Sequence, residues 1–267
     1  MPLQERILKL AQTLQFGWFV GHVMLLLCSL RYGLSYITFN FYSRWARFSY
    51  RTAFVAAAAT YGIVVYKAFR ARQRGASRQQ GGPLALAGDE NVQYLAMALF
   101  WLFSRQIPLA LLPFMVYSIF HVATYTRTNI LPTLYPSPTG SSNKSSSLAE
   151  TIGKFVKEYY DSSMMLVASL EIFLWFRILF SAIIFTKGSW ILLVVYTVFL
   201  RSRYSQSSFV QGAVGQMVQR GDALVANQST PPPARDGWEA VKRLGRQVTD
   251  ATDVNRYVGG QPVKKAQ

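Results

Sequence analysis

Long apolar segments separated by short basic ones set the pattern of hydrophobic and polar positions along this chain. The most extended segment covers residues 92–125 and contains a single formal charge, Arg105. A helix needs about 20 predominantly apolar residues to cross a bilayer, and surface helices alternate apolar with polar faces. Residues 92–125 are too long and too uniformly apolar for a surface helix, so the sequence predicts a membrane protein.

The same criterion predicts an all-α polytopic fold with about four transmembrane helices and further amphipathic helices near the C-terminus. A transmembrane bundle is expected over residues 1–204. Residues 189–200 form an apolar run that is shorter than a bilayer requires, so we expect it to dip into the membrane, although the pattern leaves open whether it spans. The expected spans lie near residues 14–37, 48–69, 105–125 and 163–185.

The longest apolar segment contains a predicted break. Arg105 is followed closely by Pro108, and proline interrupts a helix because it lacks an N–H group and clashes with the preceding turn. We therefore expect a short helix that ends near Phe103 and a span that begins just after it. A re-entrant hairpin fits the same residues, and both interpretations stay open.

The basic segment Lys67–Arg78, which contains no acidic residue, gives the predicted topology. Basic loops of membrane proteins are retained in the cytosol, so this segment is expected to be cytosolic. With four spans, both termini are then cytosolic and residues 127–150 face the lumen. The sequon at Asn143 would consequently be open to glycosylation.

Composition narrows the class of partner. The chain is 51% hydrophobic and carries a formal net charge of +16. No aromatic-basic stacking motif accompanies the basic segments, so we expect no nucleic-acid partner. Attraction to anionic lipid headgroups, worth about 1 kcal/mol per membrane-proximal basic residue, is the simpler interpretation. Cys28 is the single cysteine, which excludes an intrachain disulfide framework.

Residues 205–267 are expected to form a cytosolic tail with amphipathic helices at 207–226 and 236–255. Asp236 and Glu239 have the spacing of a capping box that would begin the second helix after the prolines at 231–233. An apolar stripe with basic flanks is typical of a helix lying in the membrane interface. The predicted membrane- or partner-binding residues are Trp238, Val241, Lys242, Arg243, Leu244, Arg246 and Val248.

Candidate chemistry is sparse. His22 and His121 lie in apolar segments without any catalytic or metal-binding motif, so we predict no catalytic, cofactor or metal site and no enzyme. Arg105, Glu171 and Arg177 are charges within apolar segments, where each costs roughly 3 kcal/mol on insertion scales. We expect an intramembrane ion pair in which Glu171 meets Arg105 or Arg31 from another helix. The alternative is a transport path that uses Arg105 and Glu171.

Three blocks of sequence, at residues 110–126, 166–180 and 190–207, resemble the family that includes transmembrane protein thirty-three, Krüppel homologue two and the fungal pore-membrane nucleoporins. The resemblance covers roughly residues 10–220. It is most specific at Leu112, Pro113, Phe114, Tyr117, Ser118, His121, Thr124, Tyr125, Glu171, Ile172, Arg201, Arg203, Tyr204 and Ser205.

The resemblance implies a non-enzymatic tetraspan protein of the endoplasmic reticulum and nuclear envelope membrane, including the nuclear pore, with cytosolic termini. Animal members of the family are associated with reticulons and tubule shape, and fungal members with nuclear pore complex assembly and distribution. The fungal tail is described as a membrane-binding amphipathic region that contacts an import receptor. The resulting hypothesis is a protein that shapes or organises membrane and supports nuclear pore complex assembly, with nucleoporins and reticulon-type proteins among its partners. The alternative is a small transporter or channel.

Overall fold

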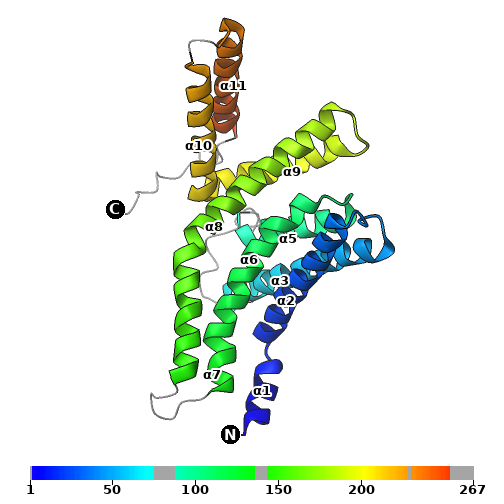
Figure 1. The fold of residues 1–267 in the computed structure, drawn as a ribbon, viewed down its shortest axis with the longest axis vertical. Helices are drawn as coiled ribbons and strands as arrows, with labels where there is room; N and C mark the ends of the chain where they lie inside the picture. The colour runs from blue at the N-terminus through cyan, green and yellow to red at the C-terminus, as the bar shows by residue number, and fades with distance from the viewer. Residues whose placement is uncertain (1, 75–87, 136–142, 228–229, 253–267) are drawn as a thin grey trace. The chain divides into compact units, whose positions relative to one another are not determined.

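The computed structural model describes residues 2–74, 88–135, 143–227 and 230–252, and confirms the all-α fold (Figure 1). The chain divides into two compact units, Met1–Arg203 and Tyr204–Gln267. Two predicted features fall partly outside the described residues. They are the end of the basic segment, at residues 75–78, and the last residues of the predicted tail helix, at 253–255.

The first unit begins with a helical hairpin. A short helix α1 (Leu3–Ala11) precedes α2 (Leu14–Ile37), which pairs with α3 (Arg44–Arg74). The two helices approach closely because small side chains line their contact. A Cβ atom added to Gly21 would lie 2.5 Å from Cγ2 of Thr60. Small residues at such positions allow van der Waals packing between membrane helices, where lipid offers no hydrophobic driving force.

A second hairpin follows in the chain. Helix α5 (Glu90–Phe103) ends before a short 3₁₀ turn at Pro108–Ala110, and α6 (Leu111–Tyr125) follows. The hydroxyl groups of Tyr94 and Tyr117 lie 3.1 Å apart, so the start of α5 lies beside the middle of α6. The chain therefore reverses direction after Phe103. This geometry fits a re-entrant hairpin, and it also fits a short helix followed by the span-length segment Pro108–Leu134. Helix α5 is about 21 Å long at 1.5 Å per residue, less than the ~30 Å of a bilayer core.

The third hairpin joins α8 (Asn143–Ile183) to α9 (Ser189–Gln206). Trp175 Nε1 donates to Thr197 Oγ1 at 2.8 Å, which fixes the antiparallel pairing. Gly188 closes the turn with φ of 76°, a left-handed conformation that favours glycine. Helix α9 extends beyond the predicted membrane-dipping segment 189–200.

All three hairpin turns lie at one end of the first unit (Figure 1). Arg105 Nη2 donates to Ser189 Oγ at 3.1 Å, which joins the second turn to the third. The N–H of Ile107 donates to Tyr50 Oη at 3.1 Å and ties the second turn to α3. The first unit is therefore a set of three hairpins whose turns meet.

The opposite end of this unit bears on the predicted topology. After α6 the chain forms a π turn at Thr126–Ile130 and a short helix α7 (Leu131–Leu134). Helix α1 contacts α7, so the N-terminal region and residues 131–134 lie at the same end. The alternation that places the N-terminus and residues 127–150 on opposite sides of a membrane stays a prediction. The contact adds a second one, in which α5 and α6 enter and leave the membrane on the side of α1.

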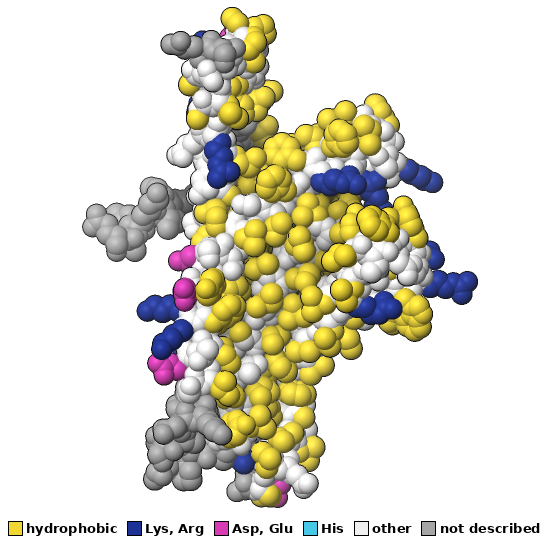
Figure 2. Space-filling model, in the orientation of Figure 1, with side chains coloured by type: hydrophobic (Ala, Val, Ile, Leu, Met, Phe, Trp, Pro, Cys, Tyr) yellow, Lys and Arg dark blue, Asp and Glu magenta, His cyan; other side chains and the backbone are white. Residues whose placement is uncertain are grey.

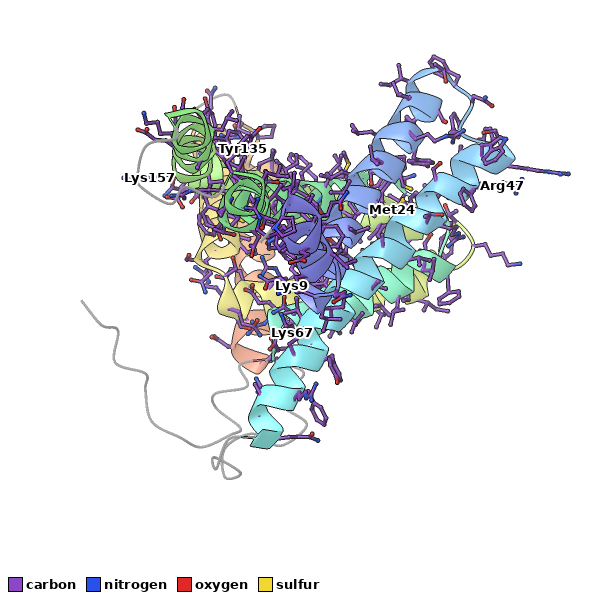
Figure 3. The ribbon with its side chains drawn as sticks, turned by 90° about the horizontal axis from the view of Figure 1, so that it is seen from below. Lys9, Met24, Arg47, Lys67, Tyr135 and Lys157 are labelled. Carbon is purple, nitrogen blue, oxygen red and sulfur yellow. The ribbon has the colours of Figure 1, made fainter. Side chains whose placement is uncertain are left out.

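Four helical segments are long and apolar enough to cross a membrane, in agreement with the predicted number. Figure 3 shows that the α2–α3 pair, marked by Met24, Arg47 and Lys67, crosses α7 and the N-terminal part of α8 at a steep angle. Tyr135 and Lys157 mark these latter helices, which are seen nearly end-on. The four segments are Leu14–Ile37, Arg44–Gln73, Pro108–Leu134 and Ser147–Ile183.

The second unit is a hairpin of α10 (Ser208–Val225) and α11 (Pro232–Ala251). Pro231 occupies the N-cap position of α11 and Pro232 its first turn. The predicted capping box at Asp236 is therefore wrong, because Asp236 already lies inside the helix. Proline is well tolerated in a first helical turn, where the missing N–H would have no helical partner, so the prolines begin this helix instead of preceding it.

Candidate functional site

Glu171 is the centre of a buried polar network in the first unit, and its cationic partner is Arg203. Glu171 belongs to α8 and Arg203 to α9, so the α8–α9 hairpin brings them together. Arg203 Nε lies 3.4 Å from Glu171 Oε2, and the two side chains are only 3% and 1% exposed. The ion pair is therefore removed from solvent.

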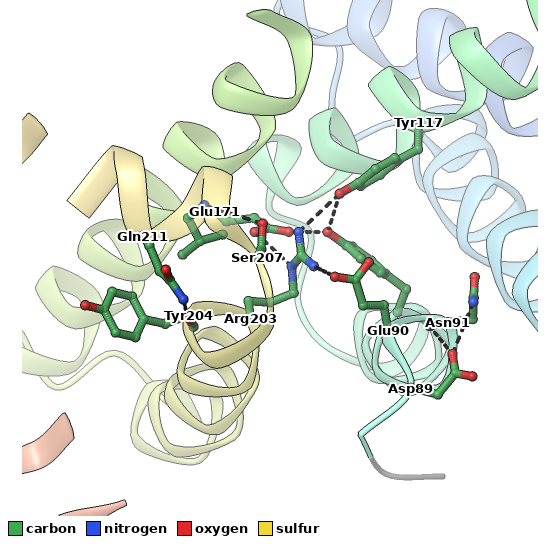
Figure 4. Close-up of polar contacts among 11 residues, drawn as sticks. Asp89, Glu90, Asn91, Tyr117, Glu171, Arg203, Tyr204, Ser207 and Gln211 are labelled. Atoms are coloured by element: carbon green, nitrogen blue, oxygen red, sulfur yellow. Dashed lines mark hydrogen bonds and ion pairs between the residues drawn. The ribbon is translucent and has the colours of Figure 1, made fainter. Parts of the chain in front are cut away.

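Helices α5 and α6 complete this network (Figure 4). Arg203 Nη1 lies 2.7 Å from Glu90 Oε1, and Arg203 Nη2 donates to Tyr117 Oη at 3.2 Å. The hydroxyl of Tyr94 donates to Glu171 Oε1, while the Arg203 guanidinium carbon lies 5.2 Å from the centre of the Tyr94 ring. One arginine thus joins four helices through two carboxylates and two tyrosines.

The arrangement of donors and acceptors suits this network to holding the helices together. A buried ion pair offsets its desolvation cost only when further hydrogen bonds satisfy its remaining polar atoms. Tyr94 supplies such a bond to Glu171, while Glu90 and Tyr117 supply bonds to Arg203. The charged groups of Glu171 and Arg203 are both hydrogen-bonded by other side chains of the protein. The geometry therefore fixes the register of α5, α6, α8 and α9 against one another.

The predicted partner of Glu171 is corrected by these contacts. Arg105 lies in the turn after α5 and donates to Ser189, and Arg177 donates to Ser181 on its own helix. Arg31, the other expected partner, donates to the carbonyl of Trp45 and to Ser49 Oγ. Within the described residues, no salt bridge joins any of these three arginines to Glu171. Burial and the nearby charge of Arg177 both lower the pKa of Arg105. These two arginines repel each other at the turn end instead of sharing a carboxylate.

Arg203 is the functional residue that the predicted ion pair missed. The sequence carried a usable signal, because Glu171 and Arg203 lie at nearly equal separations from the turn at residues 184–188. An antiparallel pairing of α8 with α9 would have placed them side by side. A short membrane-dipping run at residues 189–200 would leave Arg203 in a basic exit from the membrane, whereas α9 continues to Gln206 and brings Arg203 beside Glu171.

The two histidines also pack against each other. His22 Nδ1 lies 2.9 Å from Ser118 Oγ, and the rings of His22 and His121 are 4.7 Å apart. A cavity of about 330 Å³ opens between His121 and the edge of the buried network at Glu90. Among the residues that the structure describes, no group of three or more histidine, cysteine, aspartate and glutamate side chains could hold a metal ion.

Two of the predicted tail residues hold the α10–α11 hairpin together. Trp238 Nε1 donates to Asp222 Oδ1 at 2.7 Å, and Lys242 Nζ lies 2.8 Å from the same oxygen. The indole ring covers Gly221, where any Cβ atom would overlap it. Hydrogen bonds from Lys242 and then Trp238 lower the pKa of Asp222. Trp238 therefore faces α10, and its expected place on the membrane-binding face is corrected.

The remaining tail residues form an exposed surface on α11. Val241, Leu244 and Val248 are 57%, 59% and 54% exposed. Arg243 and Arg246 are exposed on the same helix. An apolar stripe with neighbouring arginines is suited to a membrane interface, because the stripe enters the acyl boundary while the guanidinium groups reach the headgroups.

Comparison with known proteins adds independent findings. A family model described as "Transmembrane protein 33/Nucleoporin POM33" matches residues 4–248. "Nucleoporin POM33" of Chaetomium thermophilum is 52% identical, over 99% of this chain and 96% of that protein. "Tetra-spanning protein 1" of Schizosaccharomyces pombe is 35% identical, over 100% and 91%, and "Pore membrane protein of 33 kDa" of Saccharomyces cerevisiae is 32% identical, over 90% and 85%. No solved structure matches the chain.

Proposed function

The chain belongs to the Transmembrane protein 33/Nucleoporin POM33 family, and on that premise we propose that it is a non-enzymatic protein of the nuclear pore membrane and endoplasmic reticulum. In this proposal the chain organises membrane where nuclear pore complexes assemble and are distributed. The names of the relatives support the location, since they include a nucleoporin, a pore membrane protein and a "Pore and endoplasmic reticulum protein of 33 kDa".

The observation that carries the membrane-organising part is the exposed apolar face of α11. Val241, Leu244 and Val248 are each more than half exposed, and they lie on the same helix as Arg243 and Arg246. Inserted into the cytosolic leaflet, this face occupies headgroup area without crossing the bilayer, which favours curved membrane such as a pore rim. Anionic lipids are its proposed contacts, with nucleoporins, reticulon-type proteins and an import receptor as further partners.

The separate contacts of Arg105 and Glu171 support the structural interpretation over the transporter alternative. A transport path through Arg105 and Glu171 requires both charges to face a common route. Arg105 contacts Ser189 at the turn end, whereas Glu171 lies in the buried network with Arg203. The protein contacts around Glu171 support a structural role for that carboxylate.

The test uses the full chain, fused to a fluorescent protein and expressed in Saccharomyces cerevisiae that lacks its own 33-kDa pore membrane protein. The double variant Leu244→Asp/Val248→Asp places charge on the exposed apolar face. We expect it to remain in the endoplasmic reticulum, with its enrichment at the nuclear rim, beside a nucleoporin marker, reduced about fivefold or more because charged side chains do not enter the acyl boundary.

The single variant Leu244→Asp adds one acid to the apolar stripe, and its matched control adds the same charge at another position of α11. Gln247→Asp adds an acid to an exposed site of α11 away from the apolar stripe. It should retain the distribution of the unchanged protein. Full rim enrichment of the double variant would contradict the role of this face, and equal loss in the control would reduce the effect to net charge.

A further inference from the structure

A cavity of about 640 Å³ lies where the first and second hairpin turns meet α8. Its walls come from α2, the α2–α3 turn, the start of α3, the segment before α6, and α8. Three arginines, Arg47, Arg51 and Arg177, line it, and its described lining includes no aspartate or glutamate. Apart from Gln106, the remaining lining is aromatic and aliphatic, with Tyr36 and Ile107 among its residues.

Charge at this cavity is not balanced by the protein. Arg51 Nη1 donates to the carbonyl of Trp101 at 3.2 Å, and Arg177 donates to Ser181. Neither contact neutralises a guanidinium. The side chain of Arg47 has no hydrogen bond or ion pair within the described part of the chain, and only its backbone N–H donates, to the carbonyl of Ser43 at 3.1 Å. Clustered arginines beside apolar walls repel one another and are stabilised by a bound anion.

The surroundings place this cavity at headgroup depth. Phe39, Tyr42 and Trp45 at the first turn are 85%, 79% and 67% exposed, and Phe185 at the third turn is 80% exposed. Figure 2 shows Lys and Arg side chains projecting among hydrophobic ones at this end. Exposed aromatic rings together with basic side chains are typical of the boundary between acyl chains and headgroups.

We propose that this cavity binds the phosphate of a phospholipid headgroup, with Arg47, Arg51 and Arg177 contacting the phosphate oxygens. Guanidinium groups match phosphate geometry through paired N–H donors, so more than one arginine can engage a single group. Tyr36 and Ile107 would contact the glycerol and upper acyl region of the same lipid. The bound lipid would join the first and second turns to α8, because Arg47 and Arg51 come from α3, Arg177 comes from α8, and residues 106–109 of the second turn line the same cavity.

Native mass spectrometry of the purified full chain in detergent tests this proposal. The probes are dioctanoyl phosphatidylcholine, dioctanoylglycerol and inorganic phosphate, added in separate titrations. We expect the phospholipid to bind and the Arg47→Gln/Arg177→Gln double variant to bind it ~10-fold or more weakly, a change that corresponds to the loss of charge-assisted contacts. The control Arg44→Gln removes an exposed arginine of the same helix outside the cavity and should bind within about twofold of the unchanged chain.

The outcomes separate the sources of the ligand. Equal binding of dioctanoylglycerol would show an apolar groove and overturn the phosphate assignment. Inorganic phosphate binding as tightly as the phospholipid would overturn the lipid assignment. Equal weakening by Arg44→Gln would reduce the effect to surface charge. Circular dichroism verifies folding, and where the double variant is unfolded the single variants Arg47→Gln and Arg47→Lys replace it, the first expected to weaken binding and the second to retain most of it.

Discussion

At the scale of single residues, the pairing of Arg203 with Glu171 is expected to contribute strongly to the stability of the first unit. Changing Glu171→Gln leaves the guanidinium short of a charge, and changing Arg203→Met leaves Glu171 buried without its cation. Breaking a buried pair by removing one partner costs about 3–5 kcal/mol, so each single variant should unfold at a lower temperature than the unchanged protein. The double variant Glu171→Gln/Arg203→Met should lose less unfolding free energy than the two single variants lose together, as measured by thermal unfolding in detergent micelles.

The control for this coupling is Arg105→Gln, which removes the cation first expected to pair with Glu171. Arg105 donates to Ser189 at the turn end, away from the buried network. Its effect should add to that of Glu171→Gln without coupling, because residues with no shared partners contribute independently. Coupling between Glu171 and Arg105, together with additivity between Glu171 and Arg203, would contradict the observed pairing.

At the scale of elements, the α10–α11 hairpin is expected to respond to acid through Asp222. The pKa of Asp222 is lowered from its ordinary 3.8 by hydrogen bonds from Lys242 and Trp238. The contribution of a carboxyl with a depressed pKa is present above its ordinary pKa and disappears as pH falls through the folded pKa. In protein labelled with ¹⁵N-tryptophan, the indole N–H resonance of Trp238 should therefore be constant near neutral pH and shift only below about pH 4.

Two variants identify this titration. Trp238→Phe assigns the resonance by removing it, and Asp222→Asn should abolish the acid shift while preserving the other indole signals. A midpoint above the ordinary aspartate pKa, or a shift that persists in Asp222→Asn, would show that Asp222 does not accept this hydrogen bond in solution.

The helices also show how far the sequence could predict this fold. Apolar runs located the four helical segments that are long and apolar enough to cross a membrane, because length and hydropathy are local properties. The cost of a buried charge correctly indicated that Glu171 needs a partner. The identity of that partner depended on the path of α5 and α9, whose reversals at residues 104–107 and 184–188 bring distant residues together. Trp238 was misplaced for the same reason, since a helical wheel of α11 alone contains no information about α10 packed against it.

At the scale of the whole molecule, the contact of α1 with α7 makes topology the sharpest remaining prediction. Replacing Cys28 by serine gives a cysteine-free chain, into which single cysteines can be placed at exposed positions. Gln12→Cys and Lys157→Cys probe the end that carries α1 and α7, while Asn40→Cys and Lys187→Cys probe the turns. A membrane-impermeant maleimide added to sealed microsomes should label the first two together and spare the turns until the membrane is permeabilised.

This outcome separates the two topologies because they differ at two sites, Lys157 and Lys187; alternation of four spans leaves Lys187→Cys reactive, whereas three hairpins protect it. Alternation of four spans, with residues 127–150 in the lumen, protects Lys157→Cys while Gln12→Cys reacts. Three hairpins with their turns at one end make both react, because α5 and α6 enter and leave on the side where α1 lies. Protection of Lys157→Cys would therefore require α7 to separate from α1. The exposed face of α11 can act on the cytosolic leaflet only if its connection to α9 emerges on the side of Gln12, which a fifth probe, Gln247→Cys at an exposed position of α11, measures in the same assay.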